Sequence, residues 1–321
     1  MSLFDDNPAT PPEQLPPAEQ SASEPSVSLT GDPISYAAAA PSVALQPSRD
    51  LPEDLRISWS WPHFLTFLLF GLLSQFAIAI VIIGYYSASR HFTEEQFKRF
   101  MADPKILVGT NVLWFALIML FLYITLAVLR GLPFWRSLGW RKLKSDPLEG
   151  KGRPWMYFFT GCGLAVFVAI ASSHVKNTDH LPIQELFKNR TGAMLVMAMA
   201  VFVAPLVEET VFRGYLYPFF AGKLAHFAEI FGVDSSLAIR VGTVTGIFVT
   251  GILFGLLHGS QLGWTWGLVS LLTLVGIIFT FARAWTGTVL ASFLLHLGYN
   301  SMIAASSIFI TKGFTQLPPG S

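Results

Sequence analysis

The sequence predicts an all-α protein, a polytopic transmembrane bundle of about seven to eight helical spans. Two observations carry this prediction. Hydrophobic residues make up 52% of the 321 residues and charged residues only 13%, whereas an ordinary soluble domain is about one-quarter charged. Long apolar runs also recur along the chain, and each approaches or exceeds the length that crosses the hydrocarbon of a bilayer.

The elements follow in order along the chain. Residues 1–57 are rich in Pro, Ser and Ala, cannot form a core, and are expected to be a disordered tail. Residues 58–312 form the predicted membrane domain. Its seven expected spans are Phe64–Tyr86, Leu107–Val128, Trp155–Ser172, Met194–Phe220, Val241–His258, Leu262–Phe281 and Val289–Ile310. An eighth span results if the long fourth segment is split.

Positive charges in the loops indicate an orientation. The N-terminal tail and the loop between the second and third spans share one side, and they carry Arg49, Arg56, Arg130, Arg136, Arg141, Lys142, Lys144, Lys151 and Arg153. The opposite side has the smaller set Arg90, Lys98, Arg99, Lys105, Lys176, Lys188 and Arg190. The positive-inside rule therefore predicts a multi-pass protein of the plasma (inner) membrane with a cytoplasmic N-terminus.

The overall charge limits the partners. A net charge of +1 leaves no basic field for a nucleic acid. The expected partners are membrane lipid and a membrane-associated peptide or protein, and nothing in the sequence indicates an oligomeric state. Cys162 is the only cysteine, so no intrachain disulfide is expected.

Two adjacent glutamates, Glu208 and Glu209, interrupt the fourth apolar run. Each ionisable group at membrane depth costs roughly 2.5–3.5 kcal/mol and is by default a functional residue. On a helix, Glu209 and Arg213 are four residues apart and can pair. Glu208 points about 100° away from Glu209, so it is predicted to lack that partner and to be free for chemistry. The alternative is that both carboxylates belong to a buried polar network.

Three further polar residues occur in the later spans. Phe254 and His258 are four apart at the end of the fifth span, and His296 and Asn300 are four apart in the last. A lone histidine in an apolar helix is more often a packing residue. Together with Glu208, however, these side chains supply a base, imidazoles and an amide donor for a developing oxyanion. This set predicts hydrolysis by an activated water.

Small and helix-breaking residues show how these groups could meet. Glycines recur every four residues from Gly251 to Gly267, which lets membrane helices approach closely. Pro205, three residues before Glu208, should loosen the helix and admit water to the carboxylate.

The motifs Glu208-Glu209-x-x-x-Arg213, Phe254-x-x-x-His258 and His296-x-x-x-Asn300 resemble those of the CAAX-protease and bacteriocin-processing (CPBP, or Abi) family, whose best-known members are the type II CAAX prenyl endopeptidases. The resemblance covers roughly residues 194–310, the motif-bearing half of the membrane domain. It implies an intramembrane endopeptidase in which Glu208 activates water with the help of His258. His296 and Asn300 would stabilise the oxyanion, while Glu209 and Arg213 hold the helix in place.

Three questions remain open at this stage. Glu208, His258 and His296 are a two-histidine, one-carboxylate set that could hold a catalytic zinc ion. The family's label of metalloprotease implies such a metal. A metal-free glutamate mechanism competes with it and is slightly favoured here. The rival to an enzyme is a non-catalytic membrane scaffold or bacteriocin-immunity-type protein. The substrate is equally open between a prenylated CAAX protein, a bacteriocin precursor and another membrane peptide.

A second Glu-Glu-x-x-x-Arg pattern tests the first. Glu94, Glu95 and Arg99 also satisfy it, but Thr93 and Gln96 predict a capping box that opens a short surface helix. We expect no catalysis there.

Depth and entry can also be predicted. Glu208, His258, His296 and Asn300 should line one cavity, although His258 lies near the end of its span and Glu208 well inside its own. Either the fifth span starts later than Val241 and continues past Gly259, or a funnel leads to the site. With the N-terminus inside, the cavity is expected to open toward the cytoplasm, and single cysteines placed near Tyr217 and Arg283 should not be labelled by a membrane-impermeant thiol reagent from the outer face.

Overall fold

The described residues of the computed structural model, 51–89, 93–144, 152–176, 181, 182, 184 and 190–315, contain helices and short connections and no strand. The predicted tail up to residue 50 lies outside them. The helices are α1 (Trp61–Ser89), α2 (Glu94–Met101), α3 (Pro104–Leu122), α4 (Phe134–Ser137), α5 (Pro154–Ser172), α6 (Arg190–Ala198), α7 (Ala204–Glu209), α8 (Tyr217–Ile230), α9 (Ser235–Leu257), α10 (Trp266–Thr286) and α11 (Val289–Ile310). The all-α polytopic bundle is thereby confirmed.

Within the described residues, seven helical stretches are long and apolar enough to cross a membrane. The largest difference from the expected spans concerns the fourth. It is one continuous helix of 41 residues, Arg190–Ile230, which at 1.5 Å per residue is roughly 60 Å long. It comprises α6, α7 and α8, joined by two π-helical segments, Met199–Val203 and Thr210–Leu216. The helix is therefore distorted on both sides of the two glutamates.

Helix ends follow from local capping. Asp103 accepts from the backbone N–H of Lys105 at the start of α3, where Pro104 takes the first helical position, a position at which a missing N–H costs nothing. Asp234 caps α9 in the same way. Gly287, with φ 71°, ends α10 in the left-handed conformation. The expected capping box of α2 is confirmed by the reciprocal bonds of Thr93 and Gln96.

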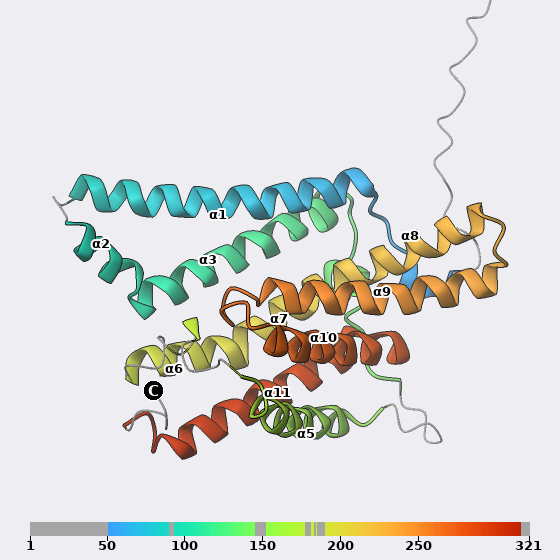
Figure 1. The fold of residues 1–321 in the computed structure, drawn as a ribbon. Helices are drawn as coiled ribbons and strands as arrows, with labels where there is room; N and C mark the ends of the chain where they lie inside the picture. Colours follow the sequence, from blue (N-terminus) through green and yellow to red (C-terminus); the bar gives the residue numbers. More distant parts are fainter. Residues whose placement is uncertain are drawn as a thin grey trace, which may run out of the picture. The chain divides into compact units, whose positions relative to one another are not determined.

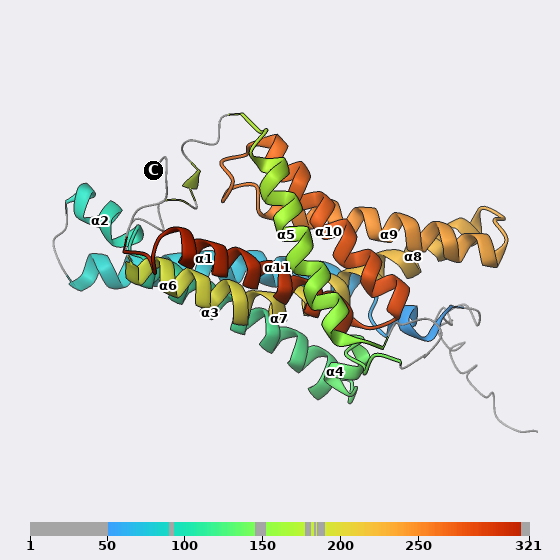
Figure 2. The same ribbon diagram turned by 90° about the horizontal axis from the view of Figure 1, so that it is seen from below.

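The bundle places α1 and α3 on one side and α5 and α11 on the other, with α8, α9 and α10 between them (Figure 1). α9 packs along both α8 and α10, and α5 packs against α11 (Figure 2). Glycines permit this closeness: a Cβ on Gly251 would lie 2.4 Å from Ile277 Cγ1, and one on Gly255 would lie 2.1 Å from Thr273 Oγ1. The predicted role of these two glycines in helix packing agrees with the structure.

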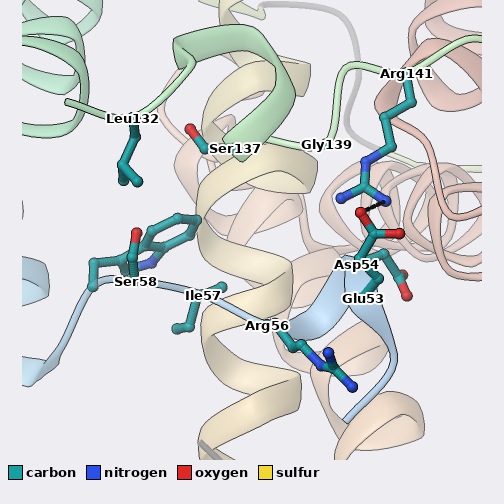
Figure 3. A pocket seen from close by; sticks show the side chains of 10 residues that line it. Glu53, Asp54, Arg56, Ile57, Ser58, Leu132, Ser137, Gly139 and Arg141 are labelled. Carbon is teal, nitrogen blue, oxygen red and sulfur yellow. Dashed lines mark ion pairs between the residues drawn. The ribbon is translucent and has the colours of Figure 1, made fainter. Parts of the chain in front are cut away.

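The segment just before α1 is packed against the bundle. Sequence reasoning assigned residues 51–57 to the tail, yet Leu51 and Leu55 are buried. Asp54 receives a hydrogen bond of 3.1 Å from the buried guanidinium of Arg283, and Glu53 pairs with Arg141 at 3.2 Å. These contacts border a small cavity of about 230 Å³ between this segment and the loop that follows α3 (Figure 3). The segment thus ties α1 to the end of α10.

Candidate active site

The two adjacent glutamates of α7 lie in different surroundings. The Glu209 side chain is fully buried and accepts from Arg213 Nη1 at 2.9 Å. Arg213 is also fully buried, and its other nitrogens donate to the Gly276 carbonyl at 2.9 Å and to Thr280 Oγ1 at 3.3 Å. Its guanidinium lies 4.6 Å from the centre of the Phe254 ring, a cation–π distance. Glu209 and Arg213 therefore form a closed buried pair between α7 and α10.

Glu208 faces elsewhere and keeps 15% of its side chain exposed. Its Oε2 lies 3.9 Å from His258 Nε2 and 3.9 Å from His296 Nε2. Both distances are too long for a direct hydrogen bond but suit a shared water molecule. The three side chains come from α7, from the end of α9 and from α11, and they meet around one point.

Each histidine is oriented through its other ring nitrogen. His258 Nδ1 lies 2.7 Å from the Phe254 carbonyl, one turn earlier in α9, and so donates to it. His258 caps α9 just beyond its membrane-spanning stretch. Burial lowers its pKa, more than the bond to the Phe254 carbonyl raises it, so the ring is neutral at pH 7 and Nε2 is an acceptor. His296 Nδ1 lies 3.0 Å from Glu209 Oε1, which leaves its Nε2 facing Glu208.

Asn300 lies one turn after His296 on the same face of α11. Its Nδ2 donates to the carbonyl of Ala200 at 2.6 Å. The side chain also borders the cavity that contains Glu208. All four predicted site residues thus line one cavity, and His258 Nε2 lies 3.9 Å from Glu208 Oε2.

The cavity has a volume of about 590 Å³. Apart from the four site residues its lining is mainly apolar, and includes Phe115, Val196, Met199, Leu272, Val275 and Ile303. Asn111, Ser260 and Gln261 add neutral polar groups. A cavity of this size and lining fits a ligand that is largely apolar with a few hydrogen-bonding groups.

The cavity is bordered by connecting segments from one end of the bundle only. Ala102 before α3, Pro182 before α6, and Gln261 and Leu262 between α9 and α10 line it. No described residue of the loops at the other end, where α1 begins and α3 ends, contributes to it. The cavity therefore extends to the end of the bundle at which α1 finishes.

This placement corrects two expectations. The fifth span starts earlier than Val241 and ends at Leu257, so the expectation of a span that starts later and continues past Gly259 is wrong. A cytoplasmic N-terminus and a cytoplasmic entrance were expected together, but the cavity extends toward the end of the bundle opposite to the start of α1. Tyr217 and Arg283, near which labelling was to test the cytoplasmic face, are buried at 1% exposure each and do not line the cavity.

The fit of a metal ion can be tested on the same atoms. Donors around a tetrahedral zinc lie about 3.4 Å apart, since Zn–N and Zn–O bonds are about 2.1 Å. The two observed separations are 3.9 Å. Among the described residues, no group of three His, Cys, Asp or Glu side chains is placed to hold a metal ion. The three side chains as placed are thus farther apart than the donors of a tetrahedral zinc ion, and the slightly favoured metal-free mechanism stays a prediction.

Sequence reasoning missed several supporting residues. Thr280 and the Gly276 carbonyl complete the environment of Arg213, and Phe279 packs against His296 with ring centres 4.9 Å apart. The only signal for Thr280 is a hydroxyl in an apolar run. The Ala200 carbonyl, which Asn300 binds, carries no side-chain signal at all, although Pro205 gives an indirect one.

The fold and this cavity define a polytopic helical membrane protein with a polar site enclosed by its helices. Residues 190–302 match the family model described as "Type II CAAX prenyl endopeptidase Rce1-like". The match spans all three motifs and leaves α1, α3 and α5 outside it. It confirms the resemblance of this part of the chain to the type II CAAX prenyl endopeptidases. No curated protein and no solved structure matches the chain.

Proposed function

We propose that this protein is an intramembrane endopeptidase in which Glu208 activates a water molecule that hydrolyses a peptide bond. The observation that carries the proposal is the position of Glu208 Oε2, 3.9 Å from Nε2 of both His258 and His296. A water between Glu208 Oε2 and either histidine nitrogen can lie within ordinary hydrogen-bond lengths of both atoms. Glu209 is not available for this role, because its side chain is fully buried and does not line the cavity.

The reaction divides among the four residues as follows. Glu208 takes a proton from the water, while the neutral Nε2 of His258 accepts a hydrogen bond from the water's other O–H and so orients the water. The water oxygen attacks the carbonyl carbon, and the carbonyl oxygen becomes an oxyanion. When its ring carries both protons, His296 donates to that oxyanion from Nε2, and the second N–H of Asn300 adds a donor. Glu208 then passes its proton to the leaving nitrogen as the C–N bond breaks.

The lining of the cavity supports a membrane-associated substrate. An extended peptide can present its carbonyl to the polar site while an apolar portion lies against the aliphatic and aromatic side chains. Of the substrates that the family implies, a prenylated CAAX-type protein has this combination. The protein would act as an integral enzyme of the plasma (inner) membrane.

Cleavage by the purified protein tests the proposal. The protein is reconstituted into liposomes and given quenched fluorescent peptides that end in a CAAX sequence, either farnesylated on cysteine or unmodified. We expect cleavage of the farnesylated peptide, with the products identified by mass spectrometry. The variant Glu208→Gln should lower kcat by about 10²–10⁴-fold, the usual contribution of a general base, with an unchanged melting temperature.

Three outcomes would overturn parts of the proposal. Full activity in Glu208→Gln would remove Glu208 as the base. The membrane scaffold would be favoured by two results together: the wild-type protein cleaves neither peptide, and the Glu208→Gln variant still supports the protein's biological role in cells. Cleavage of the unmodified peptide alone would keep the protease and reject the prenylated substrate.

A further inference from the structure

The Asn300 side chain donates its hydrogen bond to the protein backbone and not to another site residue. Its Nδ2 lies 2.6 Å from the Ala200 carbonyl, which belongs to the π-helical segment Met199–Val203. Ala200 precedes Glu208 by two helical turns. The contact therefore acts on the part of the long helix that leads into the two glutamates.

The hydrogen bonds of this helix show why Ala200 needs an outside donor. In a regular α-helix the N–H of Ala204 would bind the Ala200 carbonyl. Here that N–H donates to Met199 instead. The next N–H along the chain would be that of residue 205, but Pro205 has none. The N–H groups that would bind the Ala200 carbonyl in an α-helix or a π-helix, those of residues 204 and 205, are thus both lost to it, at a depth where an unsatisfied carbonyl is costly.

The same face of α11 provides a second link one turn away. His296 binds Glu209 on one side of Glu208, at 3.0 Å, and Asn300 binds Ala200 on the other. The stretch from Ala200 to Glu209 is held at both ends by one helix. Glu208 lies between these two links and has no bond of its own that fixes its direction.

We propose that Asn300 is a positioning residue, which supplies the donor that Pro205 removes and thereby fixes the π-helical turn that directs Glu208 into the cavity. The need to direct Glu208 into the cavity rests on the proposed function, but the hydrogen bond from Asn300 to the Ala200 carbonyl, here called the cap, does not. Pro205 and Asn300 act as a pair: the proline lacks the N–H that would bind the Ala200 carbonyl, and the Asn300 amide donates to that carbonyl instead. An amide is needed because the partner is a carbonyl, which a carboxylate repels.

A double-mutant cycle tests the pair. The four proteins are the wild type, Asn300→Ala, Pro205→Ala and the double variant, each measured for melting temperature in the same detergent. Asn300→Ala should lower Tm by roughly 3–8 °C, the effect of an unsatisfied buried carbonyl in a domain of this size. In the Pro205→Ala background the new N–H can bind Ala200, so the same change should cost less than half as much. Equal losses in both backgrounds would overturn the proposal.

Asn111 provides a matched control. It borders the same cavity from α3, and its Nδ2 donates at 2.8 Å to Leu107 of its own helix. No proline removes a donor there, so any change in Tm from Asn111→Ala should be the same with and without Pro205. A coupling as large as that of Asn300 would mean that Pro205→Ala merely loosens the whole site.

Hydrogen exchange gives a second measurement if Pro205→Ala does not fold. In Asn300→Ala alone, the amides from Val203 to Glu209 should exchange at least severalfold faster than in the wild type, whereas those of α9 should not change. Unchanged exchange over this stretch would leave Asn300 with an oxyanion role only. Because neither readout depends on turnover, failure of the protease proposal would not be mistaken for failure of the cap.

Discussion

Glu208 and Glu209 should respond differently to the same isosteric change. Glu209→Gln removes the negative charge from a carboxylate whose side chain, like that of its partner Arg213, is fully buried. The guanidinium keeps its charge, so the variant contains an uncompensated cation surrounded by Phe254, Phe279 and Phe212. Glu208→Gln removes a carboxylate that has no direct partner and leaves the surrounding packing in place.

The size of the difference follows from the geometry. Breaking a buried ion pair by removing one partner costs about 3–5 kcal/mol. The Gln oxygen can still accept from Arg213 at the 2.9 Å position, so the lower end of that range, about 3 kcal/mol, is expected. At about 2–4 °C per kcal/mol for a domain of this size, Tm should fall by about 6–12 °C. The same change at Glu208 should shift Tm by less than about 2 °C.

Thermal unfolding of both variants in one detergent, followed by intrinsic tryptophan fluorescence, measures the difference. The surface pair of α2 is the matched control, because Glu95 and Arg99 have the same spacing at 2.6 Å but are mostly exposed. Glu95→Gln should leave Tm unchanged, since exposed pairs contribute little. Equal losses of Tm at Glu208 and Glu209 would refute the division of labour between them.

Two further predictions concern metal and access. Metal analysis of the purified protein should find less than one zinc per chain, and exhaustive chelation should leave peptide cleavage intact; loss of cleavage on chelation, restored by added zinc, would establish a metal enzyme. Single cysteines that replace Gln261 and Lys144, in a Cys162→Ser background, should be labelled by a membrane-impermeant thiol reagent from opposite faces of the membrane. The face that labels Gln261 is the entrance face, and labelling of both from one face would contradict the described topology.

The sequence was a good guide wherever the signal depended on spacing along one helix. The pairing of Glu209 with Arg213 follows from their four-residue separation, and the structure shows it at 2.9 Å. The apolar runs likewise predicted seven spans, because length and composition alone decide whether a segment can cross a bilayer. The second Glu-Glu-x-x-x-Arg pattern was correctly assigned to a surface helix from its capping residues.

The sequence was a poor guide wherever the answer depended on contacts between distant segments or on backbone groups. The π-helical turns beside Glu208 leave no pattern in the side chains, and only Pro205 hints at them. The link from Asn300 to Ala200 joins residues 100 positions apart through a carbonyl that every residue has. The direction of the cavity depends on which loops border it, and a count of charges in those loops cannot report this.

Glu209 also explains why stability and catalysis are difficult to separate in this site. Its Oε1 binds Arg213, which anchors α10 through Gly276 and Thr280, and it binds His296, which faces Glu208. A change at Glu209 therefore disturbs the helix packing and the histidine together, and lost activity in such a variant says little about the chemistry. Glu208 has no such structural role beside its chemical one, because its carboxylate has no direct hydrogen-bond partner. A loss of turnover that occurs at an unchanged Tm is consequently the signature of the base, and a loss of both is the signature of its support.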